Sequence, residues 1–236
     1  MLTALRAEVL KANVELSRRG LAKHTFGNAS AIDRREGRVV IKPSGVPYDA
    51  MTADDLVVTD LDGKVVEGSL RPSSDLATHL VLYRAFAAIG GVVHTHSHFA
   101  TAWAQSLHEI PCLGTTHADH FRGAVPITDP LTDAEIGAEY ENATGQAIVR
   151  RFAGIDPMQM PAVLVANHAS FVWGESVSAA VETADILEEV AKMAYHTLTL
   201  DPGAEPVSDA LLQKHFLRKH GAKAYYGQAR RATGDE

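Results

Sequence analysis

The sequence predicts a mixed fold, either α+β or a layered α/β/α arrangement, around a mainly antiparallel sheet. Segments with helical periodicity are interspersed with short Val- and Ile-rich segments, without strict strand–helix alternation. Asp62-Gly63 lies between two such segments and is typical of a β-hairpin turn. No Pro-, Gly- or Ser-rich linker and no internal repeat divides the 236 residues, so we expect one domain.

The predicted helices rest on apolar periodicity and on capping residues. The first spans residues 3–19 and ends at Gly20, and a second begins after Pro72-Ser73-Ser74 with Ser74 as its N-cap. The capping-box sequence Thr132-Asp-Ala-Glu135 opens a helix that we expect to reach about Phe152. The last two predicted helices span residues 176–200 and 208–220.

The predicted strands are short, apolar and bounded by turn residues. They span residues 38–41, 56–58, 64–66, 91–95, 162–166 and 170–173. Asn167-His168 forms the turn between the last two of them.

Composition narrows the class of protein. The formal net charge of −7 argues against a general nucleic-acid binder. No apolar run reaches the roughly 18 residues that a membrane span requires, and residues 1–20 lack the apolar region of a signal peptide. The single cysteine, Cys112, excludes an intramolecular disulfide framework and is expected to fill the core. We therefore expect a cytoplasmic protein without membrane or nucleic-acid partners.

Three histidines follow two predicted strands. His94 and His96 come directly after the apolar segment 89–93, and their i, i+2 spacing on extended backbone directs both to one side. His168 follows the apolar run 162–166 in the same way. Two strand ends that deliver imidazoles to one place predict a divalent-metal site.

Asp75 is the best candidate for a fourth ligand, because it lies in the first turn of the helix after Ser73-Ser74. Three histidines and a carboxylate suit Zn²⁺, with Mn²⁺ or Co²⁺ as weaker candidates. His98 shares the strand parity of His94 and His96, and we expect it to lie beyond the ligand positions.

Three short segments rich in small and hydroxyl residues could bind a phosphate. They are Gly27-Asn28, Ser44-Gly45 and Ser73-Ser74, and Lys42 adds a positive charge. Glycine permits close backbone approach, and a helix N-terminus offers free N–H donors.

Two further residues could transfer protons. Asp119 ends the polar segment 115–119, and Tyr226 lies in a polar, glycine-containing segment that could reach a site. Both could exchange protons with alcohol or alkoxide oxygens if their pKa values are shifted towards neutrality.

Seven motifs carry a resemblance that covers residues 1–228. They are GNAS (27–30), KPSG (42–45), MTADDLVV (51–58), RPSSD (71–75), HTHS (94–97), GTTHAD (114–119) and KHFLRKHGAKAYYGQ (214–228). They resemble the L-ribulose-5-phosphate 4-epimerases of the class II aldolase superfamily. The resemblance implies a three-layer α/β/α fold and a homotetramer with the active site at a subunit interface. Residues 229–236 are additional to the family, and we expect a flexible tail there.

The resemblance also assigns residues. The family's zinc ligands match Asp75, His94, His96 and His168. Its phosphate-binding positions match Gly27, Asn28, Ser44, Gly45, Ser73 and Ser74, with Lys42 nearby. Its proton donor/acceptor positions match Asp119 and, from a neighbouring subunit, Tyr226, while Thr115, Glu141 and His215 match supporting positions. The related aldolases carry Glu where this chain has Asp75, and His168 lies in Asn-His-Ala-Ser rather than Ser-His-Gly-Pro.

The activity that the resemblance implies is zinc-dependent C4 epimerisation of a pentulose phosphate, L-ribulose 5-phosphate, to D-xylulose 5-phosphate, as in L-arabinose catabolism. The expected route is retro-aldol cleavage of C3–C4, rotation of the bound glycolaldehyde phosphate and re-addition to the enediolate. The nearest alternative is an aldolase or epimerase for a related sugar phosphate such as L-fuculose 1-phosphate. An alternative of another class is a noncatalytic assembly protein whose metal only fixes an oligomer.

Overall fold

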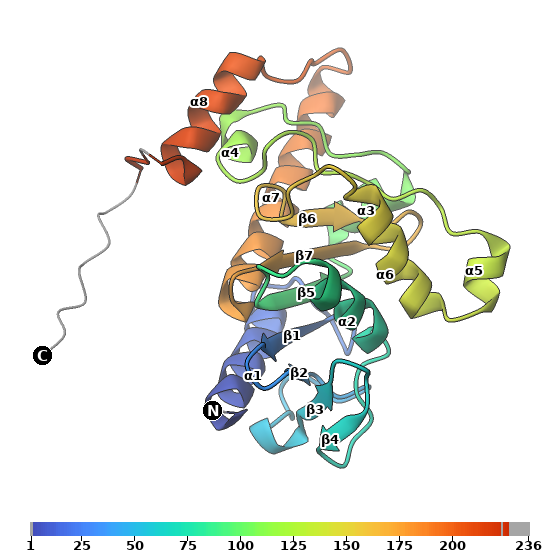
Figure 1. The fold of residues 1–236 in the computed structure, drawn as a ribbon. Coiled ribbons are helices and arrows are strands. Elements are labelled where there is room, and N and C mark those ends of the chain that lie inside the picture. Colours follow the sequence, from blue (N-terminus) through green and yellow to red (C-terminus); the bar gives the residue numbers. More distant parts are fainter. Residues whose placement is uncertain (1, 223, 227–236) are drawn as a thin grey trace, which may run out of the picture.

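The computed structural model describes residues 2–222 and 224–226 (Figure 1). Within these residues seven strands form one sheet in the order β4-β3-β2-β1-β5-β7-β6, and every neighbouring pair is antiparallel. The strands are β1 (Asn28–Asp33), β2 (Arg38–Ile41), β3 (Val57–Asp60), β4 (Val65–Glu67), β5 (Gly91–Thr95), β6 (Ala162–Leu164) and β7 (Ser170–Gly174). The predicted antiparallel sheet is therefore confirmed.

Helices lie on both faces of this sheet. The α-helices are α1 (Leu2–Arg18), α2 (Leu76–Ala85), α3 (His98–Gln105), α4 (Thr115–Ala118), α5 (Asp133–Gly137), α6 (Tyr140–Arg151), α7 (Val177–Leu200) and α8 (Asp209–His220), and a short 3₁₀ turn spans Ala53–Asp55. Figure 1 shows α1 and α7 on one face and α2 and α6 on the other. This arrangement confirms the predicted three-layer α/β/α fold. No described helix combines the length and apolar character needed to cross a membrane.

Aromatic packing joins the α2–α6 layer to the sheet. Phe86 ends α2, Phe152 ends α6, and Trp173 lies on β7. Their ring centroids are 5.0 to 5.6 Å apart, within the range of favourable aromatic pairs. Burial of these large rings fixes α2 and α6 relative to β7, and with them the residues at the N-terminal ends of both helices.

The structure corrects four sequence predictions. Strand β1 was not predicted, although it is central to the sheet. Ser74 is not the N-cap of α2; Asp75 occupies that position. The helix predicted from Thr132 to Phe152 is broken into α5 and α6, because the backbone leaves the helical region at Ala138 and Glu139.

The fourth correction concerns His98, which begins helix α3 and so does not continue the strand parity of His94 and His96.

Strand register places the predicted metal and phosphate residues side by side. Asn28 at the start of β1 pairs with His94 near the end of β5, and His94 pairs on its other side with Phe171 of β7. The phosphate segment that begins at Gly27 is therefore a neighbour of the histidine strand in space.

Candidate metal centre and substrate pocket

The three predicted metal ligands converge on one point. His94, His96 and His168 each offer a ring nitrogen within 4.8 Å of the others. The Nε2 atoms of His94 and His96 are 3.1 Å apart. Tetrahedral zinc with Zn–N bonds of about 2.0 to 2.1 Å places its nitrogens about 3.3 Å apart. The separation fits a shared metal ion.

Local contacts hold His94 in the ligating orientation. Its Nδ1 donates to the carbonyl of Ser170 at 2.8 Å, and the ring of Phe171 stacks on the imidazole at a centroid distance of 4.2 Å. With the proton on Nδ1, the lone pair of Nε2 is available to a metal.

The other two predicted ligands, His96 and His168, favour the neutral form. Burial, with the adjacent His94 as a smaller cause, lowers the pKa of both His96 and His168 to about 4. Neutral imidazole is the form that binds metal.

Asp75 lines the same cavity as the histidines and is a half-buried carboxylate. Burial alone would raise the pKa of Asp75, but electrostatic interactions with His94 and His79 and the hydrogen bond from Asn28 outweigh it and lower the pKa. The Asn28 amide donates to Asp75 Oδ2 at 2.6 Å and to Ser73 Oγ at 3.0 Å. Asp75 lines the same cavity but is not part of the cluster in which His94, His96 and His168 offer ring nitrogens within 4.8 Å of one another, so its role as a fourth ligand stays a prediction.

One cavity gathers the metal candidates and the predicted phosphate residues. Its volume is about 380 Å³. Its lining includes twelve residues predicted from the sequence: Gly27, Asn28, Lys42, Ser44, Gly45, Ser73, Ser74, Asp75, His94, His96, Glu141 and His168. The convergence that the three phosphate segments required is therefore present in the structure.

Lys42 gives the cavity a buried positive charge. Only 2% of Lys42 is exposed, and its Nζ donates to the carbonyl of Pro43 at 3.2 Å and lies 4.9 Å from the ring centroid of Tyr48. Burial lowers its pKa. No carboxylate of the described residues lies within ion-pair distance of it. A buried cation without an anionic partner is costly, so the site favours an anionic ligand.

Gly27 lets the predicted phosphate-binding segment 27–28 approach the backbone of strand β5, which carries His94. Its φ is +77°, and a Cβ at this position would lie 2.6 Å from the carbonyl oxygen of His94. Only glycine meets both requirements.

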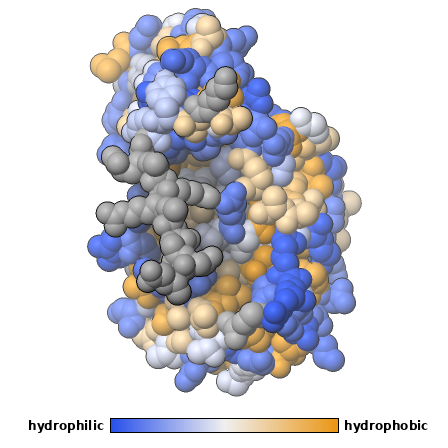
Figure 2. Space-filling model, turned by 60° about the vertical axis from the view of Figure 1, so that its left-hand side comes forward, coloured by the Kyte–Doolittle hydropathy of each residue, from blue (hydrophilic) through white to orange (hydrophobic). Residues whose placement is uncertain are grey.

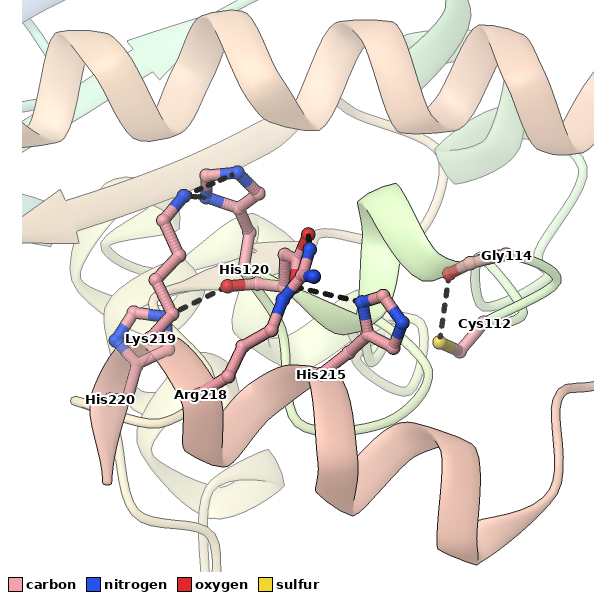
Figure 3. A network of polar contacts seen from close by, with 8 residues as sticks. Cys112, Gly114, His120, His215, Arg218, Lys219 and His220 are labelled. Atoms are coloured by element: carbon pink, nitrogen blue, oxygen red, sulfur yellow. Dashed lines mark hydrogen bonds and ion pairs between the residues drawn. The ribbon is translucent and has the colours of Figure 1, made fainter. Parts of the chain in front are cut away.

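Asp119, the C-cap of α4, and His215 of α8 lie in a second cluster. Figure 3 shows His215 and Arg218 of this cluster on α8. Arg218 donates from Nε to Asp119 Oδ1 at 2.9 Å and from Nη2 to Oδ2 at 2.6 Å, and His215 Nδ1 approaches Oδ1 at 3.0 Å. Burial would raise the pKa of Asp119, but the hydrogen bonds from Arg218 and His215 hold it below its usual value. Asp119 is thus a carboxylate in a fixed orientation.

Tyr226 belongs to the same cluster. The Arg218 guanidinium lies 4.8 Å from its ring centroid, and the Tyr226 amide donates to the Arg218 carbonyl at 3.1 Å. The side chains of Tyr225 and Tyr226 are exposed, as is Leu217. Figure 2 shows hydrophobic residues at several places on one face of the molecule, among hydrophilic ones.

The two groups of predicted residues are separate within one chain. None of Thr115, Asp119, His215 and Tyr226 is among the residues that line the metal cavity. Within a single chain, the predicted metal and phosphate residues therefore line one cavity, and the acid/base candidates are not among its lining residues.

Two further polar residues lie around the candidate metal centre: Tyr140, which sequence reasoning missed, and His79, which it noted as near the ligands in sequence but gave no role. Tyr140 lines the cavity, and its hydroxyl is 3.4 Å from His168 Nδ1. His79 is fully buried one helical turn after Asp75, and its Nδ1 is 2.7 Å from Ser30 Oγ. Neither belongs to a motif; the position of His79 four residues after Asp75 on a predicted helix was the available signal. His98, as expected, does not line the cavity.

Comparison with known proteins gives consistent matches. Residues 7–195 match the family described as class II aldolase and adducin N-terminal domain. Proteins named L-ribulose-5-phosphate 4-epimerase UlaF, from Salmonella paratyphi A (strain ATCC 9150 / SARB42) and from Salmonella typhi, are each 53% identical over 224 residues, which is 95% of this chain and 98% of theirs.

Solved structures agree with this. A structure titled L-fuculose 1-phosphate aldolase superposes with a TM-score of 0.77 at 25% identity, covering 90% of this chain and 94% of that one. The l-fuculose-1-phosphate aldolase from Thermus thermophilus superposes with a TM-score of 0.66 at 26% identity, covering 86% and 98%.

Proposed function

Because the chain belongs to the class II aldolase and adducin N-terminal domain family, we propose that it is a zinc-dependent L-ribulose-5-phosphate 4-epimerase. The observation that carries the proposal is the single cavity that combines three histidines and Asp75 with the buried Lys42. Such a cavity suits a sugar phosphate that needs both a metal and an anion site. The choice of L-ribulose 5-phosphate as substrate rests on the relatives with 53% identity, which are named for this reaction.

Inversion at C4 of a 2-ketose 5-phosphate needs a bond other than C4–H to break. The C4 hydrogen is not adjacent to the C2 carbonyl, so its removal leaves no stabilised enolate. Cleavage of C3–C4 does leave one, on the three-carbon fragment. Lewis-acid stabilisation of that developing negative charge is the chemistry that zinc supplies when it is bound by His94, His96, His168 and Asp75.

The phosphate residues then act as a tether. Cleavage releases glycolaldehyde phosphate, which must stay bound while its aldehyde turns to present the opposite face. Lys42 supplies the charge, and Ser44, Ser73 and Ser74 supply hydroxyl groups on the wall of the same cavity. A firmly held phosphate favours re-addition over release.

Asp119 and Tyr226 are the proposed proton-transfer groups. One removes the proton of the C4 hydroxyl as C3–C4 breaks, and the other protonates the new alkoxide after re-addition. The hydrogen bonds from Arg218 and His215 lower the pKa of Asp119, away from neutrality, so within its own chain Asp119 is ionised and can accept a proton but is a weak base.

We propose that these two groups act on the cavity of a neighbouring subunit in a homotetramer. Neither lines the cavity of its own chain. Arg218 contacts both residues, so one chain would donate Asp119 and Tyr226 together. The exposed apolar side chains of Leu217 and Tyr225 beside them fit a surface that is covered in an assembly.

Mixed oligomers test this arrangement. Co-expressed His96→Asn and Tyr226→Phe chains should recover activity, because roughly a quarter of randomly assembled sites would combine an intact cavity with an intact donor. Co-expressed Asp119→Asn and Tyr226→Phe chains should recover none, because each donor surface lacks one group. Recovery in the second mixture would place Asp119 in the cavity of its own chain.

Product analysis tests the activity itself. Zinc-loaded protein should convert L-ribulose 5-phosphate to D-xylulose 5-phosphate, and a chelated sample should not. Accumulation of free glycolaldehyde phosphate would instead identify an aldolase. The likeness to L-fuculose 1-phosphate aldolase makes L-fuculose 1-phosphate the comparison substrate. Absence of conversion in the zinc-loaded sample would contradict the proposed substrate.

A further inference from the structure

We propose that Tyr140 is a positioning residue for the ligand His168 and that its hydroxyl also binds the substrate in the same cavity. The second half of this inference rests on the proposed function. The first half concerns the metal centre alone. None of the motifs in the sequence includes Tyr140, and its place in the fold is what gives it a role.

Tyr140 is the first residue of α6, and His168 lies in the turn between β6 and β7. The hydroxyl of Tyr140 lies 3.4 Å from His168 Nδ1, and the two ring centroids are 6.0 Å apart. The α6 helix is fixed relative to β7 by the contacts of Phe152 with Trp173. Tyr140 thus contacts His168 from α6, outside the β6–β7 turn in which His168 lies.

The contact falls on Nδ1 of His168 and so leaves Nε2 for a metal. For His94 that nitrogen is fixed by the Ser170 carbonyl at 2.8 Å. For the His168 imidazole ring, the Tyr140 hydroxyl is the one hydrogen-bond partner among residues 2–222 and 224–226. Partners of this kind set the tautomer and orientation of metal-bound histidines. With Nδ1–H donating to Tyr140, the Nε2 lone pair of His168 is left for the metal.

The hydroxyl proton of Tyr140 remains available. A phenol oxygen that accepts from Nδ1–H can still donate its own proton. Tyr140 lines the cavity together with Glu141 and the three histidines, and its hydroxyl lies at His168, so we place that donor within reach of a sugar phosphate bound in the cavity. Tyr140 would therefore connect His168 to an oxygen of the bound sugar.

The Tyr140→Phe variant tests the first half, because it removes only the hydroxyl. Zinc affinity, measured by competition with a chromophoric chelator and without any sugar, should fall by about 10- to 100-fold. The visible spectrum of the Co²⁺-loaded variant should also change. Tyr195→Phe is the matched control, since Tyr195 is exposed on α7 and does not line the cavity. A zinc Kd within twofold of the unaltered protein, at an equal urea midpoint, would overturn the positioning role.

The same variant tests the second half at saturating zinc. The KM for L-ribulose 5-phosphate should rise while the Tyr195→Phe value stays the same. An unchanged KM and kcat would overturn the substrate contact. If the unaltered protein does not convert this sugar at all, the proposed function fails, and the zinc measurement still decides the role of Tyr140 at His168.

Discussion

Substitution of Gly27 by alanine should lower both the free energy of unfolding and the zinc affinity, although Gly27 is not itself a predicted metal ligand. At φ +77° an alanine costs about 1 to 2 kcal/mol, because the left-handed region is unfavourable for L-residues. Its Cβ would also lie 2.6 Å from the carbonyl oxygen of His94 and 3.3 Å from Thr95 Cα. Overpacking against buried backbone adds about 1 to 3 kcal/mol. The expected loss of unfolding free energy is therefore about 2 to 5 kcal/mol.

Gly37→Ala is the matched control. Gly37 has a φ of +61°, but a Cβ there would meet nothing within 4 Å. It should lose only the conformational part, about 1 to 2 kcal/mol. Urea unfolding measures both variants, and chelator competition measures zinc affinity. We expect weaker zinc binding in Gly27→Ala alone, because relief of the contact displaces His94. Equal destabilisation of the two variants, with equal zinc affinity, would refute the reasoning.

Three further predictions follow from buried or paired charges. Lys42→Met should raise the KM for the phosphorylated substrate about 10- to 100-fold, because a charged hydrogen bond contributes about 1.5 to 3 kcal/mol; initial-rate kinetics that return an unchanged KM would remove Lys42 from the phosphate site. Burial lowers the pKa of His117 to about 4, below the unfolded value of 6.5, so its contribution to stability is complete above pH 6.5 and is lost as the pH falls towards 4. At pH 5 the loss of unfolding free energy is about 2 kcal/mol. In urea unfolding, the free energy of unfolding of His117→Gln should therefore fall less between pH 7 and pH 5 than that of the unaltered protein. An identical fall in both proteins would show that His117 does not cause it. Arg218→Ala should raise the pKa of Asp119 and move the acidic limb of the kcat/KM profile to higher pH, since Asp119 must be ionised to accept a proton; a profile that does not move would separate Arg218 from Asp119.

The elements that could be predicted from sequence are those with apolar runs or strong caps. Strands 38–41 and 91–95 were predicted to the residue, and the helix after Ser176 was predicted closely. Strand β1 escaped because Asn28-Ala-Ser-Ala-Ile-Asp33 has little of the β-branched and aromatic character of strands. The segment is a strand because it pairs with β2 on one side and β5 on the other, which are long-range contacts and not a local preference.

Two helix errors have separate causes. The segment from Thr132 to Phe152 has a good cap and no proline, but Gly137, the last residue of α5, was a local signal of the break before Tyr140 that the prediction did not use. Helix α3 begins two residues after His96. Its N-terminal amides are capped by Glu188 of α7, whose carboxylate accepts from the amides of Phe99 and Ala100 at 2.8 and 3.0 Å. A long-range cap of this kind cannot be read from neighbouring residues.

The cavity was more predictable than the fold around it. The histidines, Asp75, Lys42 and the small residues fall in short motifs, and the structure brings them together. The position of Asp119 outside the cavity was not predictable, because it depends on how α4 packs against α8. The role of Tyr140 was hidden for the same reason, since it arises from helix packing. The predicted tail at residues 229–236 lies outside the described residues.

The most direct test of the central claim is proton NMR of the product formed from L-ribulose 5-phosphate in D₂O by zinc-loaded protein. Cleavage and re-formation of C3–C4 leaves the C4–H bond intact. The account therefore predicts D-xylulose 5-phosphate with protium at C4 and without free glycolaldehyde phosphate. Deuterium at C4, accumulated aldehyde, or no conversion would contradict it.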